Sequence, residues 1–319
     1  SLPGPRALEA RCHPAGRGRV AAVLLGAFAS TLALVLAGSA RPLTPAPGRW
    51  WLGALDVGQG DALALGFADG GWLVDAGPRT LRFDAGEGTV MPFLRWAGVR
   101  TLERLALTHD DGDHTGGASA VLRGTRVVRV LVPTPEPGVP GPAARLGALA
   151  RPVQRCARGD TLHRTPPVIV RWSPAGMPLP DDNAAALVLE VGEASGRALL
   201  AADVDSTRED SLAVAPGIAV LKVAHHGSGS SSGARFLARA RPALALVTGG
   251  MRTAFGQPEP RALARLAAAG ATILRTDREG AVWLEVSAAG VRRADWRRGR
   301  PLVDACREPR SLAPREPRW

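Results

Sequence analysis

The chain of 319 residues has no tyrosine, a single lysine (Lys222) and only three cysteines. No C-x-x-C pair is present, which excludes a zinc ribbon and a thioredoxin-like redox motif. Free or buried thiols are the simpler interpretation, although Cys156 and Cys306 could form a disulfide outside the cytoplasm. Almost all of the net charge of +11 comes from arginine in a chain rich in Ala, Gly and Pro, so we treat it as compositional bias rather than evidence for nucleic acid. We expect Lys222 to be an ordinary surface residue.

Charged residues are absent from residues 20–38, "VAAVLLGAFASTLALVLAG". Nineteen helical residues span about 28 Å, close to the thickness of the hydrocarbon core. We therefore predict a transmembrane helix at 20–38, with a secretory signal peptide as the alternative because "AGSA" resembles a cleavage site. The arginines of the flanking loop, residues 1–19, place that loop in the cytoplasm. Both interpretations put the rest of the chain on the far side of the membrane.

The remaining sequence divides into a Pro-rich linker, an α/β domain and a basic tail. Residues 41–49 form the linker, and residues 50–286 alternate short apolar runs with turn residues, which predicts strands with interspersed helices. One helix is predicted to begin with Thr115 as its N-cap. Residues 272–286 are predicted to close the domain as a hairpin. Residues 287–319 are rich in Arg, and we predict a disordered tail there.

Four of the six histidines stand in two short clusters more than a hundred residues apart. The first cluster, "HDDGDHTGG", begins where a predicted strand ends. Alternate side chains of an extended segment point the same way, so His109 and Asp111 project together, while Asp113 and His114 project from the start of a helix. Imidazole and carboxylate groups suit zinc or manganese. The loop can therefore offer one ligand pair to each of two adjacent ions.

Two further strand ends carry residues that could complete such a site. His225 and His226 follow an apolar strand, and Asp203 ends the strand "ALLAAD". If the strand ends meet at one edge of a sandwich, an aspartate could bridge two ions about 3.5–4 Å apart, with a hydroxide between them. The alternative is that these residues are helix caps and turn residues. That would suit any one of them alone better than all of them together.

These motifs resemble those of a known family. "HDDGDHTGG" is similar to the H-x-[HD]-x-D-H signature of the metallo-β-lactamase superfamily. With "LDVGQGDAL", "LVDAG", "MPFLRWAGV", "LLAADVD", "LKVAHHGSGSSS" and "RTDREGAV", it occurs in the order seen in the C-terminal domain of ComEC-type competence proteins, the inner-membrane channels for DNA uptake. The resemblance covers about residues 50–286. It implies a four-layer αββα sandwich with the site at one edge of the two sheets, and a transmembrane helix before it fits this family.

The resemblance also implies a set of metal ligands for two divalent ions, manganese or zinc. His109 and Asp111 would serve one ion, and Asp113 and His114 the other. Asp203 matches the carboxylate that bridges the two ions.

The same resemblance assigns roles to residues around the ligands. We predict His226 as the remaining ligand and His225 as an oxyanion stabiliser or general acid, which makes Asp113 and His225 the candidate catalytic residues. The serine-rich loop after His226 could contact phosphate oxygens or remain solvated. Residues expected to brace the metal loop, to fill a ligand position or to meet the substrate are Asp56, Asp61, Asp75, Asn183 and Ser228.

Three positions depart from the family pattern. Ala202 replaces the usual glycine before the bridging aspartate. Many members carry a further histidine before that aspartate, but His163 stands in a turn that looks structural, so the position is filled by Asn183 or by nothing. Relatives often read G-H-P where this chain has Gln257, and glutamine cannot protonate a leaving group.

The function implied by the resemblance is that of a metal-dependent phosphodiesterase or nuclease, whose metal-bound hydroxide attacks DNA. The implied location is the inner membrane, with this domain extracytoplasmic. Its implied partners are DNA, the membrane, the channel part of the same or a longer chain and other DNA-uptake proteins. Two alternatives stay open: a hydrolase of another ester (phosphorylcholine ester, lactone or β-lactam), and a DNA-binding domain without catalysis.

Overall fold

The computed structural model describes residues 24–31, 45–134, 141–142, 144, 146, 152–174, 181–251, 255–295 and 300–301. The chain separates into two units, residues 1–40 and 41–319. In the first unit, residues 24–31 are helical and exposed; the rest of the predicted span 20–38, and residues 1–19, lie outside the described residues. Within the described parts of the chain, no helix has the length and apolarity needed to cross a membrane.

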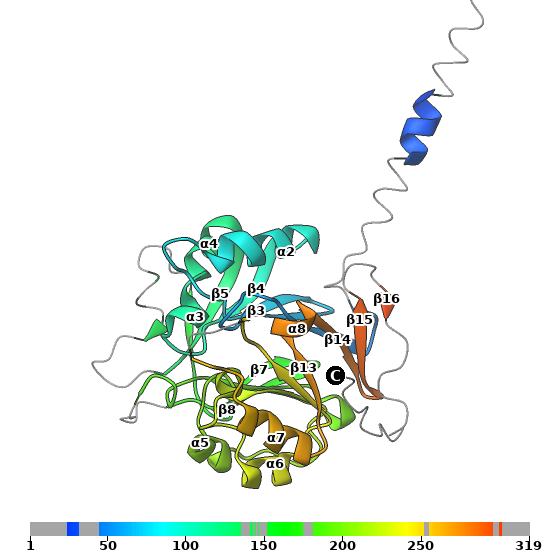
Figure 1. Ribbon diagram of the computed structural model, residues 1–319. Coiled ribbons are helices and arrows are strands. Elements are labelled where there is room, and N and C mark those ends of the chain that lie inside the picture. The colour runs from blue at the N-terminus through cyan, green and yellow to red at the C-terminus, as the bar shows by residue number, and fades with distance from the viewer. Residues whose placement is uncertain are drawn as a thin grey trace, which may run out of the picture. The chain divides into compact units, whose positions relative to one another are not determined.

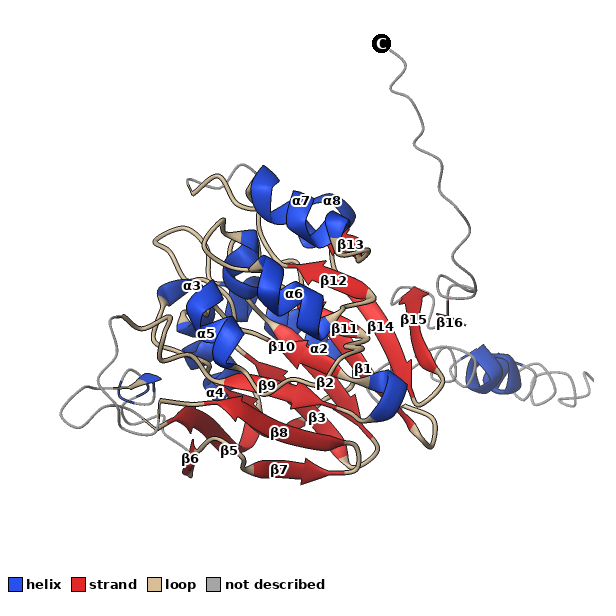
Figure 2. Ribbon diagram, turned by 90° about the horizontal axis from the view of Figure 1, so that it is seen from below, coloured by secondary structure: helices blue, strands red, loops and turns tan. Residues whose placement is uncertain are grey.

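The first of two sheets has nine strands in the order β16-β15-β14-β1-β2-β3-β4-β5-β6 (Figure 2). Strands β3 to β6 run parallel to one another, whereas β2 pairs antiparallel with β1 and β3, and β1 also pairs antiparallel with β14. The strands are β1 (Arg49–Ala54), β2 (Leu63–Phe67), β3 (Gly70–Val74), β4 (Thr101–Ala106), β5 (Arg126–Pro133), β6 (Val153–Cys156), β14 (Val282–Ser287), β15 (Gly290–Asp295) and β16 (Arg300–Pro301).

The second sheet has seven strands in the order β13-β12-β11-β10-β9-β8-β7. Strands β10 to β13 are parallel, and β9 pairs antiparallel with β10. The strands are β7 (Thr161–Arg164), β8 (Pro167–Trp172), β9 (Val188–Val191), β10 (Ala198–Leu200), β11 (Val220–Lys222), β12 (Leu244–Val247) and β13 (Thr272–Arg275).

Helices cover the outer face of each sheet (Figure 1). The π-helix η1 (Gly86–Val90), α2 (Met91–Trp96) and α4 (Ala118–Gly124) lie against the first sheet; α5 (Ser206–Ser211), α6 (Ala234–Ala240) and α7 (Pro260–Ala268) lie against the second. One apolar layer joins the two sheets, and a further layer lies under each set of helices. The expected sandwich of two sheets with helices outside is therefore confirmed.

The predicted hairpin over residues 272–286 is wrong. Strand β13 pairs in parallel with β12 in the second sheet, whereas β14 pairs with β1 in the first. The short helix α8 (Thr276–Glu279) connects them, so the chain crosses from one sheet to the other here. The two apolar runs with "DREG" between them have the local pattern of a hairpin, and only the long-range pairing separates them.

Two smaller predictions also need correction. Thr115 is the last residue of α3 (Gly112–Thr115), where its hydroxyl donates to the carbonyl of Asp111; it does not cap a helix. Residues 290–295, predicted as part of a disordered tail, form β15 paired with β14. Residues 302–319 lie outside the described residues. Cys156 is a buried free thiol, while Cys306 falls outside the described residues.

The topology brings the predicted site residues to one edge of the sandwich. Strands β3 and β4 of the first sheet end next to Asp75 and His109, and β10 and β11 of the second end next to Asp203 and His226. Ligand sites in open α/β sheets form beyond the carboxyl ends of parallel strands, because the connecting loops leave a crevice there.

Candidate metal centre

The first histidine cluster spans the loop after β4 and the short helix α3 that follows it. His109 and His114 are buried, with ring centroids 4.1 Å apart. His109 Nε2 lies 3.4 Å from Asp111 Oδ2, so the first predicted ligand pair is in contact, although the Asp111 side chain is 44% exposed. The nearby imidazole of His109 lowers the pKa of Asp111.

The second sheet places its acidic and imidazole groups directly against this loop. His114 Nε2 lies 3.3 Å from Asp203 Oδ1, and His226 Nε2 lies 3.2 Å from Asp203 Oδ2. His226 Nε2 is also 3.3 Å from Asp113 Oδ2 and 3.3 Å from His114 Nε2. Asp203 thus faces imidazoles from both sheets, and residues from distant parts of the chain converge as the sequence analysis expects.

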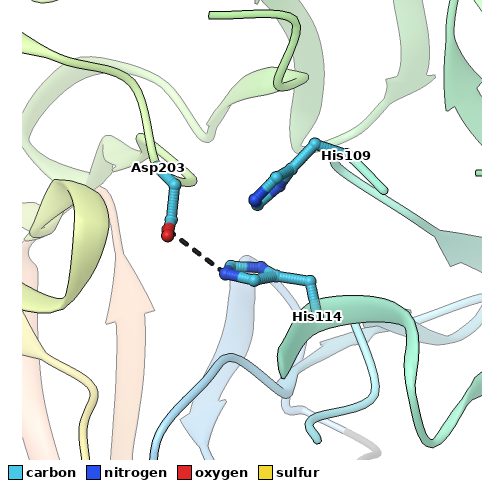
Figure 3. A group of neighbouring side chains, drawn as sticks. All are labelled: His109, His114 and Asp203. Atoms are coloured by element: carbon cyan, nitrogen blue, oxygen red, sulfur yellow. Dashed lines mark ion pairs between the residues drawn. The ribbon is translucent and has the colours of Figure 1, made fainter. Parts of the chain in front are cut away.

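Three groups of side chains have the spacing needed to hold a cation. Ligand atoms of His109, His114 and Asp203 lie within 4.8 Å of one another (Figure 3), as do those of Asp113, His114 and His226 and those of Asp61, Asp75 and His114. Within the described part of the chain, His109 Nε2 and Asp203 Oδ1 are buried without a hydrogen-bond partner. Buried polar atoms normally have partners, and imidazole with carboxylate is a donor set that suits divalent metals. The residues present therefore fit metal ions.

Asp75 holds the first cluster in position. Its carboxylate accepts hydrogen bonds of 2.8 Å from the backbone N–H and from the hydroxyl of Thr108, and it lies 2.8 Å from His114 Nδ1. An imidazole held through Nδ1 presents Nε2, so Asp75 turns His114 toward the cluster. Asp75 lies where a brace is expected, whereas nothing in the sequence points to Thr108.

Lys222 is the residue that the sequence analysis places most wrongly. It is completely buried, not on the surface. Its ammonium contacts the Asp61 carboxylate, donates to the carbonyl oxygen of Ala202 at 3.0 Å and lies 3.6 Å from Asp203 Oδ1. A compact ammonium can donate to Asp61 and Ala202 while it stays near Asp203, whereas a planar guanidinium presents its donors in a fixed fork. The signal in the sequence was that this chain uses lysine only once.

Asp61 connects this lysine to the imidazoles. The carboxylate is buried, accepts a hydrogen bond of 2.5 Å from the Thr248 hydroxyl, and lies 3.6 Å from His226 Nδ1. Although burial opposes ionisation, Lys222 and the two site histidines hold the pKa of Asp61 below its usual value. Asp61 thus supports the site behind His226, at the strand end of β12.

The site electrostatics couple carboxylates to imidazoles. Burial opposes ionisation of Asp203, yet His226, His114 and Lys222 hold its pKa well below the ordinary value. Burial likewise opposes ionisation of Asp113, but a hydrogen bond with His226 lowers its pKa to about 2. Burial disfavours the charged form of His226, but the nearby carboxylates raise its pKa to about 9. A metal ion that binds here must displace such protons.

Left-handed backbone conformations gather at the same strand ends. Asp75 has φ 58°, Ala202 φ 46°, His225 φ 51° and His226 φ 53°. A non-glycine residue in this conformation costs about 1–2 kcal/mol. The family glycine that Ala202 replaces would adopt the conformation without strain. Such strain persists where surrounding contacts hold it, and it is common at functional sites.

His225 lies beside the cluster and belongs to none of the cation-spaced groups. It is half-buried, and its backbone N–H donates to the carbonyl of Ala202 at 3.0 Å. Burial lowers the pKa of its imidazole. The serine-rich loop that follows is ordered by its own hydrogen bonds, including a 3.0 Å contact between the Ser228 and Ser230 hydroxyls. Ser231 and Ser232 are fully buried, so the interpretation of a solvated loop is wrong for them.

The remaining predicted residues take different positions. Asp56 is exposed, and its carboxylate accepts a 3.3 Å hydrogen bond from the N–H of Gly58, as in a turn. Asn183 lies in the turn before β9, with its Oδ1 buried and unpartnered within the described residues. His163, in β7, stacks on Phe67 of β2 with ring centroids 4.5 Å apart, which is a structural role.

Comparisons with known proteins agree with this geometry. The model of the metallo-β-lactamase superfamily matches residues 55–249. ComE operon protein 3 of Bacillus subtilis is 30% identical over 249 residues, which cover 72% of this chain and 32% of that protein. Competence protein ComA of Neisseria gonorrhoeae is 30% identical over 251 residues, 74% of this chain and 32% of that protein.

The chain thus spans about a third of the length of these curated relatives. Among solved structures, CmlA, a diiron β-hydroxylase from Streptomyces venezuelae, is similar with a TM-score of 0.50 and 17% identity, covering 72% of this chain and 53% of CmlA. That likeness shows the fold alone. The chain therefore belongs to the metallo-β-lactamase superfamily and is related to the ComEC-type competence proteins.

Proposed function

We propose that this domain is a metal-dependent phosphodiesterase that cleaves DNA as part of a membrane DNA-uptake protein. The observation that carries the proposal is the convergence of His109, His114, Asp203 and His226 from both sheets at cation-binding distances. The superfamily supports a metal-dependent hydrolase, and the competence relatives support a role in DNA uptake. The same relatives motivate a location at the inner membrane, with the domain extracytoplasmic and next to a channel.

The site would hold two divalent ions, manganese or zinc. Asp113, His114 and His226 would hold one, and His109 with Asp111 the other. The carboxylate of Asp203, which faces both histidine groups, would contact both ions. When bound, the ions would supply an activated water and neutralise negative charge on the phosphoryl group.

Residues next to the ligands would act on the substrate directly. Because burial lowers the pKa of His225, its imidazole is neutral at pH 7 and can donate a hydrogen bond to a developing oxyanion. This favours the stabilising role over that of general acid. Gln257 accepts a 2.9 Å hydrogen bond from the side chain of Gln59, so it joins two loops where relatives often carry histidine.

A hydrolysis assay tests the proposal. The full chain, stripped of metal and reloaded with Mn²⁺ or Zn²⁺, should degrade DNA and should leave a phosphorylcholine ester, a lactone and a β-lactam intact. Asp113→Ala should lower the rate at least about a thousandfold, because the ion held with His114 and His226 would lose a ligand and the charge balance around His226 would change. Glu193→Gln, an exposed carboxylate outside the site, should match the unaltered chain.

Three results would contradict it. Hydrolysis of one of the small esters instead of DNA would assign another substrate class. DNA cleavage that survives Asp113→Ala would place the chemistry elsewhere. DNA binding with fewer than two bound ions and no hydrolysis would favour a binding domain without catalysis.

A further inference from the structure

A pocket of about 630 Å³ opens beside the metal cluster, with Asp113 in its wall. Four parts of the chain line it: residues 56–59, residues 78–80 with Phe83, the start of α3 and Phe255. Its volume falls in the range of ligand pockets. A substrate that approaches the cluster from this side therefore contacts these loops.

Two aromatic rings stand on separate loops of this pocket. Phe83 is 42% exposed and Phe255 is 73% exposed, although both are large apolar side chains. Phenylalanine gains most from contacts that cover its ring faces. The pocket therefore presents two uncovered rings beside a carboxylate of the metal cluster.

The turn that carries Phe83 is held by its own hydrogen bonds. The N–H of Thr80 donates to the carbonyl of Phe83 at 2.7 Å, and the N–H of Phe83 donates to the Thr80 hydroxyl at 3.1 Å. A Cβ added at Gly88 would lie 3.0 Å from a Phe83 ring carbon, so the ring lies against bare backbone there. The ring is thus positioned before a ligand arrives, which lowers the entropic cost of binding.

Polar groups of the same wall suit a nucleotide. Arg79 is 57% exposed, with its Nε 3.3 Å from Asp84 Oδ2, so its guanidinium can also reach an oxyanion. Within the described residues, Gln59 Oε1 is buried without a hydrogen-bond partner, and Gln59 lines the pocket. A phosphate would pair with the Arg79 guanidinium, while Gln59, whose Oε1 is buried, only lines the wall.

We propose that Phe83 and Phe255 stack on unpaired bases of a DNA strand and so lead its phosphodiester to the cluster, with Arg79 on a phosphate. This inference rests on the proposed function and names its substrate as single-stranded DNA or a frayed end. Bases inside a duplex already stack on each other, so only unpaired bases offer their faces to protein rings.

Two neighbouring residues separate this proposal from a membrane-facing surface. Leu81 is 106% exposed on the turn of Phe83, and Met251, four residues before Phe255 in the sequence, is 80% exposed. Neither is among the described residues that line the pocket. A lipid surface would use all four apolar side chains, whereas base stacking would use only the two rings.

The test measures binding apart from cleavage. Fluorescence anisotropy of a labelled phosphorothioate oligo(dT), which resists hydrolysis, would be followed with the Mn²⁺-loaded full chain, and a duplex of equal length would be compared. Phe83→Ala and Phe255→Ala should each weaken single-strand binding about tenfold. Leu81→Ala and Met251→Ala should change it less than about twofold, and Phe83→Trp should retain binding where Phe83→Leu does not. Melting temperatures should stay unchanged, since both rings are exposed.

Each other outcome overturns the proposal. If the unaltered chain cleaves DNA while both alanine variants bind the oligonucleotide normally, the rings have no such role and the proposed function stands. If the unaltered chain neither binds nor cleaves DNA, both fail. If all four substitutions weaken binding equally, and the chain binds anionic phospholipid vesicles through them, the patch faces a membrane.

Discussion

The two sheets contribute to the metal centre in different ways. The first sheet supplies a continuous string, His109 to His114, from a single loop after β4. The second supplies Asp203, Lys222 and His226, one or two residues at a time, from loops and strands that are adjacent only in the folded sheet. The first contribution can be found by reading the sequence, because its spacing is local. The second depends on strand order, so the burial of Lys222 could not be predicted from local spacing.

The largest expected effect comes from removing the buried lysine that the second sheet supplies. Lys222→Met would leave Asp61 and Asp203 buried without their cation, and removing one partner of a buried charge network costs about 3–5 kcal/mol. We expect this loss in the free energy of unfolding, measured by urea denaturation with EDTA present. Added Mn²⁺ should stabilise the variant more than the unaltered chain, because the ions replace the missing positive charge.

A matched substitution shows whether burial is the cause. Arg123→Met removes one partner of a largely exposed pair in which Arg123 and Glu87 are 3.5 Å apart. Exposed pairs contribute little, so the change should stay within about 0.5 kcal/mol. Equal losses from both substitutions would refute a special role for Lys222.

The next effect concerns a second buried acid on the side of the second sheet. Unlike Asp61, which contacts Lys222, this acid has no cation in direct contact with its carboxyl among the described residues. Burial raises the pKa of Glu209, on α5, to about 7 from an ordinary value of 4.5. The folded state therefore holds a proton that the unfolded state has released. Stability is complete below pH 4.5 and falls as pH rises toward 7, by at most about 3 kcal/mol.

Glu209→Gln should remove this fall. Unfolding free energies would be measured between pH 4.5 and 8 for both chains, and their difference isolates Glu209 from other titrating groups. The exposed Glu87→Gln should keep the slope of the unaltered chain. A parallel pH dependence in Glu209→Gln would show that this carboxyl is not the source.

The smallest expected effect concerns the histidine loop that the first sheet supplies. Asp75→Asn weakens the support of His114 and Thr108, and losing such a partner typically lowers metal affinity 10–100-fold. Asp56→Asn, although also predicted as a brace, should change affinity less than about twofold because Asp56 is exposed. Competition with a chromophoric chelator measures both. An equal loss in the two variants would contradict the structural distinction between them.

Most of the fold was predictable because its signals are local. Short apolar runs mark strands such as β8 and β12, and "PEPRALARLAAAG" marks α7. Pairing across the molecule left no such mark. The runs that became β13 and β14 have a turn-like segment between them, yet each finds its partner in a different sheet.

The candidate site shows the same division. His109, Asp111, Asp113 and His114 could be named from their spacing, and Asp203 and His226 from strand ends and family resemblance. Lys222 follows two apolar residues at the end of a strand, a position from which a lysine usually reaches solvent. Its burial depends on acids from a loop after β1 and a loop after β10.

The pairing of β1 with β14 has a consequence for synthesis on the ribosome. Strand β1 is among the first parts of the sandwich to emerge, and β2 soon covers one of its edges. Its other edge waits for residues 282–287, which are translated more than two hundred codons later. During that interval an apolar strand has open backbone N–H and C=O groups, the kind of edge that recruits foreign strands. Nascent chains of this domain thus need shielding until residues 282–287 have been translated.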